Sequence, residues 1–70
     1  MTLVDKFLQE RKKATACMLN KDEKGLQECN QRSEELYAKF TKSDFEELIK
    51  RVNGRARHAF EKAMKEKYPD

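Results

Sequence analysis

The chain has 70 residues, of which 41% are charged and 37% hydrophobic, and its formal net charge is +3. At this length it forms one domain, residues 1–70, near the lower limit for folding without disulfides or metals. Regularly recurring apolar residues exclude a disordered chain, and no apolar run approaches the roughly 20 residues that cross a bilayer. The N-terminus lacks the basic and apolar segments of a signal peptide, so we expect a cytoplasmic protein with no membrane partner.

A first helix is predicted over about residues 2–20. Thr2 followed by Asp5 resembles a capping box, in which each side chain binds the other residue's backbone N–H. Apolar residues then recur at three- and four-residue spacing, as on one face of a helix. Two glycines and one proline are too few turn residues for a multi-strand protein, so we expect no strands.

A second helix is predicted over about residues 22–40. Asn20 with Glu23 offers its start signal, and an apolar stripe follows to Phe40. Gly25 weakens its first turn, because glycine is a poor helix former.

The third helix is predicted to be long and unbroken, over about residues 44–67. Ser43 with Glu46 is the clearest capping box in the chain, and the apolar repeat that follows stays in phase across Gly54. Gly54 should cost about 1 kcal/mol relative to alanine within a helix. The alternative is a helix that bends or breaks after Asn53.

Short connections make neighbouring helices pack antiparallel, so the sequence predicts an all-α, up-down-up three-helix bundle. The third helix would overhang the other two by roughly one and a half turns at 1.5 Å per residue. The overhang supplies a candidate apolar interface, through which the chain would dimerise or bind another protein: Phe60, Ala63 and Met64. Alternatively, the apolar residues among residues 1–4 fold over that end.

Two other topologies stay open. In a helix-turn-helix, the segment after Thr41 would be the reading helix, although the helices look too long and too antiparallel for that motif. In a coiled-coil dimer, the long helix would pair with its twin, although its many alanines and missing leucine seam oppose this.

Metal, disulfide and enzyme chemistry are poorly supported. Cys17 and Cys29 lack the CxxC spacing of a zinc site, and His58 is the only histidine, so we expect no metal. The two cysteines should face each other across the first helix pair. Helix axes lie 8–10 Å apart whereas bridged Cα atoms lie 4.4–6.8 Å apart, which favours buried thiols over a bridge. No phosphate loop or catalytic motif occurs, so we expect neither an enzyme nor a cofactor nor a small-molecule substrate.

The sharpest functional signal is a basic stripe that spans about 80° of the helical wheel at 100° per residue. Its members are Arg51, Arg55, His58, Lys62 and Lys65. Such a row can follow a line of phosphates or an acidic groove. It can equally be a solvated face, since cations near a helix C-terminus complement its dipole and no aromatic residues interleave for base stacking.

The leading functional hypothesis is a small non-enzymatic interaction or regulatory protein, which contacts another protein or itself, as a homodimer, through the third helix. The alternative is a small nucleic-acid-binding protein that uses the basic stripe.

Overall fold

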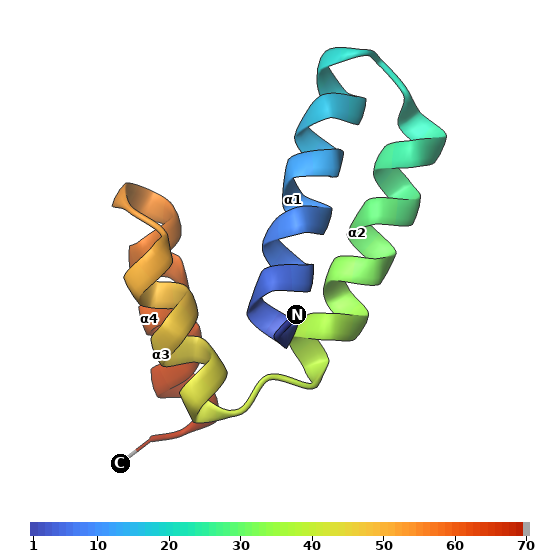
Figure 1. The fold of residues 1–70 in the computed structure, drawn as a ribbon. Coiled ribbons are helices and arrows are strands. Elements are labelled where there is room, and N and C mark those ends of the chain that lie inside the picture. Colours follow the sequence, from blue (N-terminus) through green and yellow to red (C-terminus); the bar gives the residue numbers. More distant parts are fainter. Residues whose placement is uncertain (70) are drawn as a thin grey trace. The chain divides into compact units, whose positions relative to one another are not determined.

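The computed structural model describes residues 1–69, and within that range the chain forms four α-helices and no strand (Figure 1). The helices are α1 (Leu3–Leu19), α2 (Glu23–Ala38), α3 (Lys42–Arg51) and α4 (Gly54–Lys67). They divide into two compact units, an N-terminal unit of residues 1–39 and a C-terminal unit that begins at Phe40. The all-α prediction is confirmed. The predicted count of three helices is wrong, because the segment expected to form one helix over residues 44–67 forms two.

The capping box predicted at the start of α1 is present. The Thr2 hydroxyl accepts the Asp5 N–H at 3.1 Å, and the Asp5 carboxylate accepts the Thr2 N–H at 3.0 Å. Asn20, expected to start the second helix, instead ends α1, and its N–H binds the Ala16 carbonyl. Asn20 therefore ends one helix where the sequence pattern had it start the next. The chain reverses direction at Lys21, which has a positive φ of 57°.

The N-cap of α2 is Asp22, whose carboxylate accepts the Gly25 N–H at 3.0 Å. Gly25 is more than a weak helix former here. An ideal Cβ at this position would lie 2.9 Å from the Cys17 sulfur and closer still to the Asp22 carboxylate. Glycine therefore allows α1 and the Asp22 cap to approach the first turn of α2.

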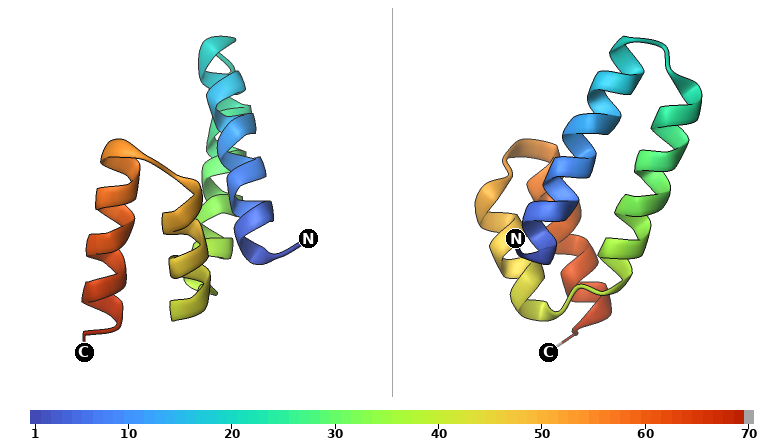
Figure 2. Two further views of the ribbon diagram at one scale, coloured as in Figure 1. Left: turned by 60° about the vertical axis from the view of Figure 1, so that its left-hand side comes forward. Right: turned by 45° about the vertical axis from the view of Figure 1, so that its right-hand side comes forward.

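Helices α1 and α2 lie side by side and antiparallel, as Figure 1 and the right-hand view of Figure 2 show. The ring centroids of Phe7 and Tyr37 are 5.8 Å apart, and Arg32 donates to Glu10 at 2.8 Å. This hydrogen bond lowers the pKa of the Glu10 carboxyl. The buried residues of the two helices are Val4, Phe7, Ala14, Cys29 and Ser33.

Helix α3 starts two residues before the predicted point. Thr41, not Ser43, is the N-cap: its hydroxyl accepts the Asp44 N–H at 3.4 Å, and the Asp44 carboxylate accepts the Thr41 N–H at 2.9 Å. Both pairs have capping-box spacing. The earlier pair satisfies the same kind of backbone groups and adds residues 42 and 43 to the helix.

The predicted long helix breaks between Arg51 and Gly54. Val52 and Asn53 are extended, with φ/ψ of −117°/160° and −132°/165°, and Gly54 has a φ of +66°. Glycine adopts this left-handed conformation without the penalty that a Cβ brings. The break lets α4 run back alongside α3 (Figures 1 and 2). Each of the two helices carries its own apolar repeat, so the apolar pattern of the sequence did not reveal the break.

The end of the C-terminal unit opposite the α3–α4 turn is closed by aromatic rings. The Phe40 and Phe45 centroids are 5.5 Å apart, and those of Phe45 and Tyr68 are 6.3 Å apart. The Tyr68 hydroxyl and the Lys67 ammonium both donate to the Phe40 carbonyl, at 3.2 and 3.1 Å. These contacts fix the last turn of α4 against the start of α3.

Candidate functional site

Helix α4 buries none of its 14 residues. The three residues of the candidate apolar interface, Phe60, Ala63 and Met64, are half-buried. The overhang that motivated this interface is absent, because the long helix is broken and α4 folds back on α3. Half-covered apolar side chains nonetheless remain on α4, so the interface itself stays a prediction.

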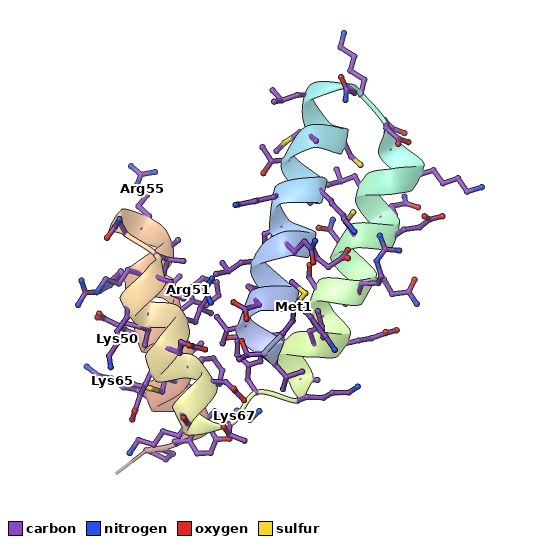
Figure 3. All side chains as sticks on the ribbon, viewed as in Figure 1. Met1, Lys50, Arg51, Arg55, Lys65 and Lys67 are labelled. Atoms are coloured by element: carbon purple, nitrogen blue, oxygen red, sulfur yellow. The ribbon has the colours of Figure 1, made fainter. Side chains whose placement is uncertain are left out.

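Four members of the predicted basic stripe lie on α4, and all four are exposed. They form what we call the basic row: Arg55, His58, Lys62 and Lys65. At 100° and 1.5 Å per residue the row occupies a strip about 80° wide and about 15 Å long. Figure 3 places Arg55 where α3 and α4 join and Lys65 toward the opposite end of the unit.

The fifth predicted member, Arg51, does not belong to the row. It is an exposed residue in the last turn of α3, on the other side of the extended residues Val52 and Asn53. Its place on the helical wheel assumed one continuous helix. In the folded chain it complements the α3 dipole together with Lys50.

The turn between α3 and α4 concentrates positive charge. Residues 48–60 contain four lysine and arginine residues and one histidine, with no aspartate or glutamate: Lys50, Arg51, Arg55, Arg57 and His58. Arg57 is paired, since its Nε donates to the Glu61 carboxylate at 3.0 Å. The four residues of the basic row make no ion pair with the residues that the structure describes, so their charges are offered to solvent or to a partner.

An open hollow lies at the C-terminal end of this row. It has a volume of about 490 Å³ and is lined by Lys42, Met64, Lys65, Tyr68 and Pro69. Its lining combines three residues with apolar groups, Met64, Tyr68 and Pro69, with two lysines. We call it the C-terminal hollow. It can accept an apolar side chain and, beside it, a carboxylate or phosphate.

The hollow is lined by residues from both the candidate apolar interface and the basic stripe, which the sequence analysis had predicted as separate surfaces. Met64 came from the candidate apolar interface and Lys65 from the basic stripe, and both line it. Lys42, Tyr68 and Pro69 were missed. In the sequence, Lys42 lies near the start of the C-terminal unit and the other two lie near its end. Only the break at Gly54 brings them together in space. The signal that could have found them is Gly54 itself, preceded by Asn53, as a helix terminator.

Other kinds of site are not indicated. Within residues 1–69 there is no cluster of three or more histidine, cysteine, aspartate or glutamate side chains that could hold a metal ion. No helix in that range combines the length and apolar character needed to cross a membrane. A comparison with known proteins gives no match to a protein-family model, a curated protein or a solved structure.

Proposed function

We propose that the chain is a small non-enzymatic interaction protein that binds an acidic, partly apolar segment of another protein through α4. The observation that carries this proposal is that α4 buries no residue, although it presents half-covered apolar side chains beside an exposed basic row. Within the C-terminal unit α4 packs on α3 alone, and this packing leaves part of the apolar stripe of α4 uncovered. A partner that covers the rest gains apolar burial worth about 25 cal/mol per Å².

The chemistry of the partner follows from the C-terminal hollow and the basic row. An apolar side chain of the partner would contact Met64 and Tyr68, while a carboxylate would lie beside the ammonium group of Lys65. Further acidic residues would follow the row toward Arg55. Such charge complementarity speeds encounter and fixes register more than it adds affinity.

A second copy of the chain fits less well. An isologous dimer places the same patch of each copy against itself, so two basic rows would meet. Like charges brought together oppose such an interface. Self-association is therefore an outcome that the experiment must distinguish, and not the proposal.

Panning of a random-peptide display library against the immobilised full-length protein tests the proposal. We expect the selected peptides to be enriched in aspartate and glutamate next to an apolar residue. A synthetic peptide of the consensus sequence should bind in fluorescence anisotropy. Met64→Glu should weaken binding by at least about 30-fold, since it desolvates a charge in an apolar contact. Lys62→Glu with Lys65→Glu should weaken it by about tenfold.

Lys12→Glu with Lys24→Glu is the matched control for the double variant, because both are exposed residues of the N-terminal unit and the pair also changes the net charge by −4, two units per substitution. It should leave affinity within about twofold, because these exposed charges are outside the proposed binding surface and are screened by salt. Peptides without acidic enrichment, or equal loss in the control, would contradict the proposal. Sedimentation equilibrium of the protein alone shows whether a dimer forms instead.

Nucleic acid is the second candidate, and the carboxylate-free stretch over residues 48–60 favours it. If the basic row contacts about four phosphates, affinity for duplex DNA should fall with salt at a log-log slope of roughly −3.6. Replacing Arg55 and Lys62 together should flatten that slope by about two units. No binding at about 50 mM salt would remove this candidate, because non-specific electrostatic affinity is high there.

A further inference from the structure

We propose that Cys17 and Cys29 form a redox-active thiol pair, which small-molecule disulfides close into a disulfide bond across the α1–α2 hairpin. Both cysteines are free in the structure. Cys29 is buried, with 3% of its surface exposed, whereas Cys17 is half-buried. The pair therefore has one thiol that a reagent can reach and one that it cannot.

Gly25 locates the Cys17 sulfur on the surface of α2. A Cβ at Gly25 would be 2.9 Å from the Cys17 Sγ. Gly25 and Cys29 are four residues apart in one helix, so they lie on the same face one turn apart. The Cys17 sulfur thus rests on the face of α2 that carries Cys29. In agreement, the pKa of the Cys17 thiol is raised by burial first and then by charge and hydrogen-bond interaction with Cys29.

The spacing of packed helices permits the bond. Helix axes lie 8–10 Å apart, but each Cα lies about 2.3 Å from its axis, so facing Cα atoms approach to roughly 3.4–5.4 Å. This range overlaps the roughly 4.4–6.8 Å of bridged cysteines. The sequence argument against a bridge compared the spacing of helix axes with the spacing of Cα atoms, which are different distances. Its expectation of free thiols agrees with the structure, although only Cys29 is fully buried. Cys29 is also held in place, since Arg32 Nη2 donates to its sulfur at 3.5 Å.

The reaction requires an entry path, which a hollow at the α1–α2 turn provides. Cys17 lines this hollow together with Met18, Lys21, Asp22, Glu23 and Leu26. The Cys17 thiol loses its proton to solvent, and the thiolate attacks one sulfur of a small disulfide such as oxidised glutathione. A mixed disulfide forms and the first thiol leaves. The deprotonated Cys29 sulfur then attacks the Cys17 sulfur, the protein disulfide forms, and the second thiol leaves. Two protein thiols are oxidised and one small disulfide is reduced to two thiols.

The test is incubation of the reduced full chain with oxidised glutathione, followed by acid quenching, mass spectrometry and thiol titration in denaturant. We expect the loss of both thiols and of two hydrogens in mass, with no glutathione retained. Because the pKa of Cys17 is raised, the rate should rise about tenfold per unit between pH 7 and 8. The bridged protein should melt roughly 12–23 °C higher, as expected for a loop of this length.

Single variants separate the roles of the two thiols, after circular dichroism has shown that each is folded. Cys29→Ser should accumulate a stable glutathione adduct on Cys17, whereas Cys17→Ser should react at least about tenfold more slowly, because the Cys29 thiol is buried. A stable adduct on the unaltered chain with Cys29 still reduced would overturn the proposal. So would the absence of reaction at both cysteines, or faster reaction of Cys17→Ser than of Cys29→Ser.

Discussion

Replacement of Gly54 by alanine distinguishes a broken from a continuous C-terminal helix by the sign of its effect on stability. In the structure, Gly54 has a φ of +66°, and a Cβ added there would meet no atom within 4 Å. The substitution therefore creates neither a clash nor a packing contact. Its effect comes from the backbone conformation alone.

The magnitude follows from known backbone preferences. Alanine in the left-handed region costs about 1–2 kcal/mol, so Gly54→Ala should lower the free energy of unfolding by that amount. In a continuous helix the same substitution would raise it by about 1 kcal/mol. The expected loss is a large part of a total that should be roughly 3.5–10 kcal/mol for a chain of this size.

Urea unfolding followed by circular dichroism at 222 nm measures the effect. With a slope of about 1 kcal/mol per molar urea, the midpoint should fall by about 1–2 M. A chemically synthesised chain with D-alanine at position 54 is the matched control, since a D-residue favours positive φ, and its midpoint should rise. Asn53 makes no side-chain cap hydrogen bond, so Asn53→Ala should change stability little. A rise in the midpoint with L-alanine would refute the broken helix.

Three further predictions concern other contacts. Gly25→Ala should lower the urea midpoint despite the helix propensity of alanine, because its Cβ meets the Cys17 sulfur and disturbs the Asp22 cap. Tyr68→Phe should lower the melting temperature by about 4–8 °C, the equivalent of about 1 kcal/mol, through loss of its hydrogen bond to the Phe40 carbonyl. The lowered pKa of Glu10 means that its stabilisation is complete above the usual value of 4.5 and is lost as pH falls through the folded-state value. Glu10→Gln should therefore reduce the acid sensitivity of the urea midpoint.

Each of these has an opposite outcome that would contradict it. A higher midpoint for Gly25→Ala would mean that α1 does not approach α2 closely at this turn. An unchanged melting temperature for Tyr68→Phe would mean that the last turn of α4 is not fixed by this bond. Equal acid sensitivity of Glu10→Gln and the unaltered chain would mean that the carboxylate gains nothing from Arg32.

The first half of the fold was readable because its signals are local. Thr2 and Asp5 cap α1 as predicted, and the two helices end within about two residues of the predicted points, which is the usual precision of helix boundaries. The cap of α2 was misassigned because Asn20 and Asp22 are both good N-caps. The chain reverses at Lys21, and this makes Asp22 the N-cap of α2. The positive φ of Lys21 could not be predicted from the sequence, because lysine is not a residue that favours it.

In the second half, α3 and α4 were predicted as one helix. The spacing of apolar residues alone did not reveal the two extended residues between them. Gly54 carried the relevant information, since glycine is common where a chain adopts positive φ. Most of the predicted basic stripe survived the error because four of its five members lie on α4, on one side of the break. The C-terminal hollow could not be predicted, since it needs Lys42 beside Met64 and Tyr68, and a continuous helix holds those residues far apart.

Methyl NMR of the three methionines tests the proposed binding role of α4 most directly. Met64 lines the C-terminal hollow, whereas Met1 and Met18 are exposed residues of the N-terminal unit and serve as internal controls. The chain, labelled with ¹³C at the methionine methyls, would be titrated with the acidic consensus peptide. We predict that the Met64 resonance shifts and saturates while those of Met1 and Met18 stay in place. Saturable shifts of Met18 without Met64, or no shift of any methyl, would contradict the assignment of the binding site to α4.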